Sequence, residues 1–172
     1  GYVPNYKGHP MQIKKAVELI QEAKRPLIIA GAGIIKSKAW EELIDLAEKR
    51  EIPVTTTLLG LGGFPSEHEL CLGMLGMHGS VAANFATQHT DLIIACGMRF
   101  DDRIAGDPKN FGRDAKIIHI DIDPAEIEKN RLIDVPIVGD LNGVINELNS
   151  KLQEVKNPEW VKQVVAWKTK YP

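Results

Sequence analysis

The sequence has little of what marks several classes of protein. Its 172 residues include two cysteines and five histidines, and 6% are aromatic. The formal net charge is -2, and lysines and arginines are spread along the chain, so nothing predicts a nucleic-acid partner. No apolar run approaches the roughly 20 residues that span a bilayer, and the first residues lack a signal-peptide pattern. We therefore expect a cytoplasmic protein with no membrane segment.

The cysteines and histidines do not form recognisable reactive groups. Cys71 and Cys96 lie in apolar surroundings without CxxC spacing, which predicts reduced, structural thiols rather than a disulfide scaffold or a redox pair. The histidines are scattered along the chain, so we expect no metal site.

What is present is an alternation of amphipathic and apolar segments in a chain of ordinary globular composition, 44% hydrophobic and 26% charged. We expect helices over 11–23, 38–50, 81–87 and 141–151, and strands over 27–30, 54–57, 91–96, 116–120 and 136–138. Ser37 is expected to cap the second helix. This order predicts an α/β fold: a three-layer α/β/α, Rossmann-like arrangement with a mainly parallel sheet. The irregular segment 58–79 is where we expect function.

The two ends of the chain have the character of connections. Residues 1–10 carry two prolines and no periodicity, and are expected to be a linker from a preceding domain. Residues 11–153 are expected to form the central domain, and 154–172 a linker or helix toward the next one. Because Trp160 and Trp167 near the end are expected to be exposed, we expect an excised domain whose edges touch neighbours.

The segment 97–106 places four charges in five positions directly after the apolar run 92–96. In open parallel sheets, ligands bind beyond the carboxyl ends of the strands. Guanidinium groups such as those of Arg99 and Arg103 suit phosphate or ring-carbonyl oxygens. Taken alone, the segment fits a solvated loop with internal ion pairs equally well.

Two glycine-containing segments also allow two interpretations each. Residues 31–33, Gly-Ala-Gly, follow a buried strand, so their N–H groups could face a pyrophosphate, although a plain tight turn explains them about as well. Residues 73–79 combine three glycines with Met74 and Met77, which could pack against a flat ring or fill gaps in the core. His78 could bind a ligand or simply be solvated.

Acidic residues end two of the expected strands. Asp123 precedes Pro124, with Glu126 three residues on, so it is interpreted as a helix cap in a capping box. Asp121 has no such local explanation and is expected to accept hydrogen bonds from ribose hydroxyls. Asp140 fits both a helix cap and a ligand contact at the same edge of the sheet.

Together these motifs resemble the central domain of the catalytic subunit of acetolactate synthase (acetohydroxyacid synthase), a thiamine-diphosphate enzyme. The resemblance runs over nearly the full chain. It is carried by residues 25–26, 55–65, 74–79, 97–103 and 121–127. Many members of that family carry a glycine where Ala32 stands and a small residue where Met98 stands.

The resemblance implies that this domain binds FAD in an extended pose. The implied cofactor-binding residues are Gly31, Ala32 and Gly33 near the pyrophosphate; Thr57, Leu58, Leu75, Gly76, Met77 and His78 along the flavin; Gly97, Met98, Arg99, Asp101 and Arg103 beside it; and Asp121, Ile122, Asp140 and Leu141 around the adenosine half. Met77, Asp102 and Arg103 are implied to line the substrate channel.

For the intact enzyme the resemblance implies condensation of pyruvate with a second 2-oxo acid (pyruvate or 2-oxobutanoate), with loss of CO2, at the start of valine, leucine and isoleucine synthesis. Thiamine diphosphate and Mg2+ are implied to bind in flanking domains of the same chain. The implied partners are further catalytic subunits, in a homodimer or homotetramer, and a regulatory small subunit. No GDG…N motif is present, so we expect no catalytic residue here and no activity of this chain alone.

Three alternatives stay open. One is the central domain of a related thiamine-diphosphate enzyme, such as oxalyl-CoA decarboxylase, glyoxylate carboligase or pyruvate oxidase, since fold alone does not separate them. Another is a flavin-free structural domain. The third, an NAD-dependent oxidoreductase, is disfavoured because no acid/base set for hydride transfer is recognisable.

Overall fold

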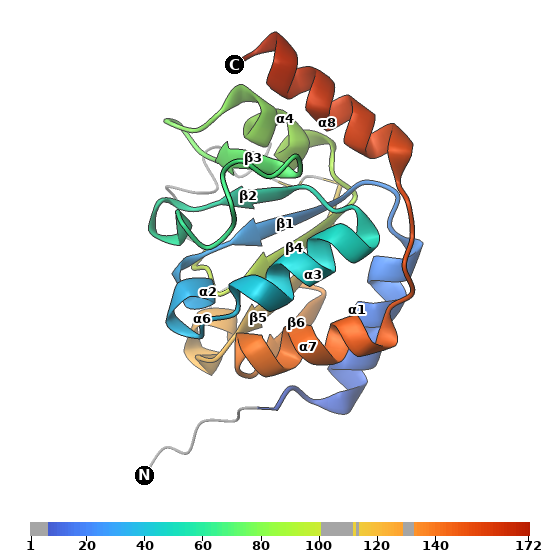
Figure 1. The fold of residues 1–172 in the computed structure, drawn as a ribbon. Helices are drawn as coiled ribbons and strands as arrows, with labels where there is room; N and C mark the ends of the chain where they lie inside the picture. Colours follow the sequence, from blue (N-terminus) through green and yellow to red (C-terminus); the bar gives the residue numbers. More distant parts are fainter. Residues whose placement is uncertain (1–6, 101–111, 113, 129–132) are drawn as a thin grey trace.

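The computed structural model describes residues 7–100, 112, 114–128 and 133–172, in which helices and strands alternate (Figure 1). The strands are β1 (Pro26–Ala30), β2 (Val54–Thr56), β3 (Cys71–Met74), β4 (Leu92–Cys96), β5 (Lys116–Asp121) and β6 (Val135–Val138). The helices are α1 (Pro10–Glu22), α2 (Ala32–Lys36), α3 (Trp40–Arg50), α4 (Val81–His89), α6 (Pro124–Glu128), α7 (Leu141–Lys151) and α8 (Pro158–Lys170), with a 3-10 turn, η1, at Leu58–Gly60.

The six strands form one sheet in the order β3-β2-β1-β4-β5-β6, and every neighbouring pair is parallel. Helices α1, α3 and α7 cover one face, and α4 and α8 cover the other (Figure 1). The predicted three-layer α/β/α fold with a parallel sheet is therefore confirmed. The chain runs outward from β1 to β3 and then returns to β4 on the other side of β1. The strand order therefore reverses between β1 and β4, the point at which such sheets bind ligands.

The central strands are buried on both faces because helices cover both sides of the sheet. All five residues of β1 and all five of β4 are buried. Alternate residues of each strand enter two separate cores: Ile28 and Ile94 pack under α1, α3 and α7, whereas Leu27 and Ile93 pack under α4 and α8. Burial also raises the pKa of the Cys96 thiol to about 12, so this sulfur stays protonated in the core.

The expected cap at Ser37 is wrong. Ser37 follows the short helix α2, and its hydroxyl donates to the Gly33 carbonyl at 2.7 Å. Helix α3 begins at Trp40, and Ala39 precedes it without a side-chain cap. One turn of helix therefore comes between the first strand and the helix that the sequence predicted.

Strand β3 lies inside segment 58–79, which the sequence predicted only as irregular. The strand holds no β-branched residue, and its Gly73 has a φ of +83°. It lies at the edge of the sheet and pairs with β2 through a register shift between Val54 and Thr55. The usual sequence signals of a strand are therefore missing.

The end of the chain packs on the domain. Trp160 is buried and donates its indole N–H to the Pro26 carbonyl at 2.8 Å. Trp167 is half-buried against Phe85 and Trp160, at ring-centroid distances of 5.6 and 5.9 Å. The expectation of two exposed tryptophans is therefore wrong, because α8 covers the second face of the sheet. Within the described ranges, no helix is both long and apolar enough to cross a bilayer.

Candidate functional site

A cavity of about 930 Å³ opens at the carboxyl edge of the sheet, where the strand order reverses. Turns that follow five of the six strands contribute to its wall. It is lined by Ala32, Gly33, Lys36, Ser37, Thr57, Leu58, Leu59, Gly97, Met98, Arg99, Asp121, Ile122, Asp123, Glu126, Asp140 and Leu141. Segments far apart in the sequence thus meet at one place, as the parallel sheet requires.

Two turns meet backbone to backbone at the bottom of the cavity. The N–H of Gly31 donates to the Cys96 carbonyl at 2.9 Å, and the N–H of Gly33 donates to the Gly97 carbonyl at 3.0 Å. Gly97 has a φ of +63°, and a Cβ on it would lie 2.6 Å from the Gly33 Cα. Only glycine fits this approach. The hydrogen-bonded N–H groups of Gly31 and Gly33 do not face a ligand, contrary to one interpretation of this segment.

Arg99 extends from the end of β4 toward α6. Its Nε lies 3.4 Å from Glu126 Oε2, and its side chain is 72% exposed. Lys36, in the last turn of α2, is a second cation on the wall. Sequence reasoning missed Lys36 and Ser37 as site residues because it did not predict α2.

The acidic residues after β5 have different local roles. Asp123 Oδ1 accepts the N–H of Ala125 at 2.9 Å, so Asp123 caps α6 as predicted. The return contact of a capping box is not formed, because the Asp123 N–H donates to Asp121 Oδ1 at 2.9 Å instead. Asp121 therefore has a local role that the sequence prediction did not give it. Partial burial raises the pKa of its carboxyl above the ordinary value.

Asp140 stands at the N-cap position of α7, yet its side chain makes no capping hydrogen bond there. It lines the cavity instead, and Leu141 follows it on the wall. Of the two interpretations that the sequence allowed, the structure does not support the side-chain cap.

His119 was missed by the sequence analysis. The side chain is fully buried, and Nε2 lies 2.9 Å from the Met98 carbonyl oxygen. Burial lowers the pKa of the imidazole below its ordinary value, although the bond to Met98 and the charges of Asp121 and Glu126 oppose that shift. One signal was available: a histidine in the apolar stretch of β5, two residues before Asp121 and so on the same face of the strand.

Residues 13–148 match the family described as thiamine pyrophosphate enzyme, central domain. The chain belongs to this family. It is 54% identical over 171 residues to the probable acetolactate synthase large subunit of Methanocaldococcus jannaschii, covering 98% of this chain and 29% of that protein. It is 51% identical over 167 residues to the acetolactate synthase of Mycobacterium leprae, covering 97% of this chain and 27% of that protein. It is 50% identical over 177 residues to the acetolactate synthase large subunit of Corynebacterium glutamicum, covering 100% of this chain and 28% of that protein. The chain thus spans less than a third of the length of these relatives.

This central domain gathers most of the site residues expected from the sequence. The cavity wall includes Ala32, Gly33, Thr57, Leu58, Gly97, Met98, Arg99, Asp121, Ile122, Asp140 and Leu141. The cavity is not lined by Gly31, Leu75, Gly76, Met77 or His78. Asp101, Asp102 and Arg103 lie outside the described residues.

The loop after β3, residues 75–79, follows the strand next to β2 but does not line this cavity. Leu75 is buried, whereas Met77 is 91% exposed. Gly76 is held by Asn84, which accepts the Gly76 N–H at 3.0 Å and donates to its carbonyl at 2.9 Å. The position of this loop is therefore set by α4.

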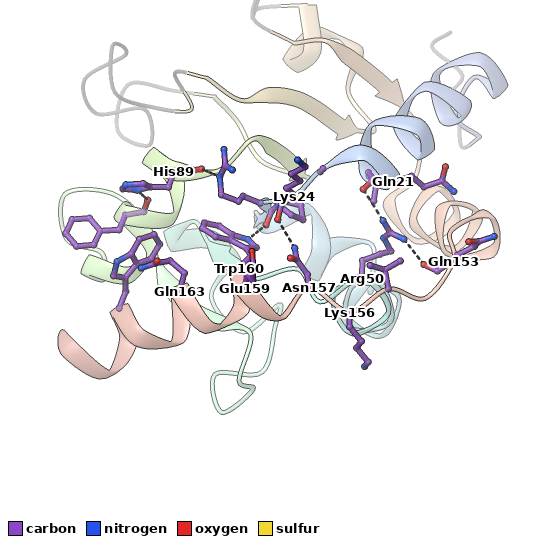
Figure 2. A pocket seen from close by; sticks show the side chains of 17 residues that line it. Gln21, Lys24, Arg50, His89, Gln153, Lys156, Asn157, Glu159, Trp160 and Gln163 are labelled. Carbon is purple, nitrogen blue, oxygen red and sulfur yellow. Dashed lines mark hydrogen bonds between the residues drawn. The ribbon is translucent and has the colours of Figure 1, made fainter.

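A second cavity, of about 1050 Å³, lies at the opposite, amino edge of the sheet, between α1, α8 and residues 153–157 (Figure 2). Its buried Arg50 donates to the main-chain carbonyls of Gln153 at 2.8 Å and Ile20 at 3.2 Å. Asn157 donates to the Lys24 carbonyl at 2.9 Å. These side chains hold the crossing chain segments together, which explains them without a ligand.

Proposed function

We propose that this chain is the FAD-binding central domain of an acetolactate synthase catalytic subunit. The observation that carries the proposal is the composition of the carboxyl-edge cavity. One side presents apolar side chains, Leu58 and Leu59, which are 68% and 75% exposed. Another presents the carboxylates of Asp121 and Asp140. A dinucleotide with a flat ring system at one end and a ribose at the other suits such a division.

The residues of the wall fit the parts of FAD. Asp140, which makes no capping bond, and Asp121 would accept hydrogen bonds from ribose hydroxyls. The side chains of Arg99 and Lys36 would contact phosphate oxygens. Leu58 and Leu59 would pack on the flavin ring. The close approach of Gly33 and Gly97 leaves no side chain between the two turns, so a ligand can lie directly on the backbone.

The reaction proposed for the whole enzyme is the condensation of pyruvate with a second 2-oxo acid, with loss of CO2. A bound flavin would supply no net redox change in this reaction, so its role would be structural. The match to less than a third of each relative supports placing thiamine diphosphate, Mg2+ and the catalytic residues in other parts of the enzyme. We propose that Met77, Asp102 and Arg103 face the substrate channel, and that flanking domains, further catalytic subunits and a regulatory subunit are the partners.

The test is FAD binding by the full-length protein and by its Asp140→Ala variant. We expect a yellow wild-type protein, formation of acetolactate from pyruvate with thiamine diphosphate and Mg2+, and about tenfold weaker FAD binding by the variant, equivalent to one lost hydrogen bond. Asp45→Ala, an exposed carboxylate on α3, is the matched control and should bind FAD like wild type. A colourless protein that forms acetolactate without added FAD would overturn the flavin assignment and favour a structural domain.

A further inference from the structure

We infer that His119 is a positioning residue for the carboxyl-edge cavity, because one of its ring nitrogens holds the main-chain turn that forms part of the cavity wall. The effect on cofactor binding rests on the proposed function. The effect on the turn itself does not.

The hydrogen bond of His119 shows that one particular ring nitrogen carries a hydrogen. Nε2 lies 2.9 Å from the Met98 carbonyl oxygen, and a carbonyl can only accept, so Nε2 carries the hydrogen. The same nitrogen lies 3.8 Å from Asp121 Oδ2. Asp121 and Met98 both line the cavity. A single buried ring therefore contacts one wall through Met98 and lies close to the other through Asp121.

The other ring nitrogen offers no reason for a histidine at this position. Nδ1 is buried and has no hydrogen-bond partner among the residues that the structure describes. An unpaired buried acceptor destabilises the fold, and an apolar side chain of similar size would avoid that cost. The ring also packs edge-on against Phe100, with centroids 5.0 Å apart, a contact that another ring could make. Of these contacts, the hydrogen bond from Nε2 to the Met98 carbonyl is therefore the one that needs a hydrogen-bond donor at position 119.

Met98 lies between two other residues of this wall. Gly97 before it has the left-handed backbone that packs on Gly33, and Arg99 after it enters the cavity. Holding the Met98 carbonyl fixes the peptide plane that joins Met98 to Arg99. The loss of this hydrogen bond should loosen residues 97–100 without disturbing the helices on the far face of the sheet.

The experiment compares two substitutions in the full-length protein. His119→Gln keeps an N–H donor near the position of Nε2, and His119→Leu removes it. For His119→Leu we expect about tenfold faster amide hydrogen exchange in residues 97–100 of the FAD-free protein, and about tenfold weaker FAD binding. His119→Gln should stay within about threefold of wild type in both. His89→Leu, which removes an exposed histidine at the end of α4, should change neither.

The outcomes separate the inference from the proposed function. If His119→Leu exchanges and binds FAD like wild type, or if both variants lose protection equally throughout the domain, His119 only fills space and the inference is wrong. Faster exchange with unchanged FAD affinity also overturns the positioning role. If wild type binds no FAD, the proposed cofactor is wrong, and the exchange of residues 97–100 in the two variants alone decides whether His119 holds the turn.

Discussion

The two cavities at opposite edges of the sheet are of similar size and differ in how the fold uses their polar groups. At the amino edge, Arg50, Asn157 and Trp160 each donate to a main-chain carbonyl (Figure 2). At the carboxyl edge, the Asp140 side chain makes no capping bond and the Arg99 side chain is largely exposed. Volume therefore does not distinguish a ligand site from a gap between segments. What distinguishes the carboxyl-edge cavity is that some of its polar side chains, such as that of Asp140, do not make the hydrogen bonds that their positions in the fold offer.

Connectivity explains this difference. Every strand of a parallel sheet ends at the same edge, so the turns there diverge into helices and leave a crevice. At the amino edge, residues 153–157 cross from α7 to α8, and the main-chain carbonyls of Ile20, Lys24 and Gln153 accept hydrogen bonds from side chains beside this path. Substitutions of carboxyl-edge groups that are not committed to a helix cap should therefore affect ligand binding, whereas those at the amino edge should affect stability alone.

The largest effect is expected for Gly97→Ala. A Cβ at this position would lie 2.6 Å from the Gly33 Cα, and the φ of +63° disfavours any side chain. We expect a loss of roughly 2–5 kcal/mol in the free energy of unfolding, from backbone strain and overpacking together, and loss of FAD binding. Denaturant unfolding and FAD titration of the full-length variant measure the two effects.

The matched control is Gly62→Ala. Gly62 has a φ of +93°, but a Cβ added to it would meet no atom within 4 Å, so only backbone strain is added. A cost of about 1–2 kcal/mol with unchanged FAD affinity is expected. Equal losses in the two variants would show that the contact between the two turns contributes nothing.

At the amino edge, Arg50→Met should destabilise the protein by roughly 2–4 kcal/mol, because the main-chain carbonyls of Ile20 and Gln153 lose a charged donor. Arg50 is 6% exposed, so water does not easily replace the lost bonds. FAD affinity should not change. Lys156→Met removes an exposed cation from the same cavity, with carboxylates 3.7 and 3.8 Å away, and should cost less than about 1 kcal/mol. Weaker FAD binding by Arg50→Met would break the distinction between the two edges.

The sequence predicted the fold where periodicity and burial act together. The apolar runs of β1 and β4 and the amphipathic helices α1 and α7 are recovered within one or two residues. It failed where tertiary contacts replace local signals. Strand β3 is held at the sheet edge despite Gly73, and α2 is a single helical turn that no apolar period reveals.

The site was predictable as a set of strand ends but not as a network of hydrogen bonds. In a parallel sheet all strands end at the same edge, so the sequence could predict that Asp121, Asp140 and the turn after β4 lie close together. That Asp121 receives the N–H of Asp123, or that a buried histidine holds Met98, depends on side-chain geometry that spacing does not encode. The sequence gives no sign that Gly31 and Gly33 use their amide groups within the fold.

A smaller effect should separate two neighbouring acids of the carboxyl edge. Asp123→Ala should cost about 0.5–2 kcal/mol of stability through loss of the α6 cap, with little change in FAD affinity. Asp121→Ala should weaken FAD binding about tenfold and cost about 0.5–1.5 kcal/mol through its bond to the Asp123 N–H. FAD titration and denaturant unfolding of both full-length variants measure this. If Asp121→Ala binds FAD like wild type, the ribose assignment is wrong.

The smallest effect is a pH dependence of stability that comes from His119. Burial lowers the pKa of this imidazole in the folded protein, whereas the unfolded value stays near 6.5. The unfolded chain therefore takes up a proton first as the pH falls. The contribution of neutral His119 is complete above pH 6.5 and is lost progressively below it, by at most about 1.4 kcal/mol per pH unit.

Denaturant unfolding of wild type and His119→Gln between about pH 7.5 and pH 5.5 isolates this contribution, since glutamine does not titrate. Asp121 acts in the opposite direction, because its raised pKa stabilises the folded protein as the pH falls, but it is present in both proteins. The stability of wild type should therefore fall relative to that of His119→Gln as the pH decreases. A difference that is constant across this range would mean that His119 has the same pKa in the folded and unfolded chain.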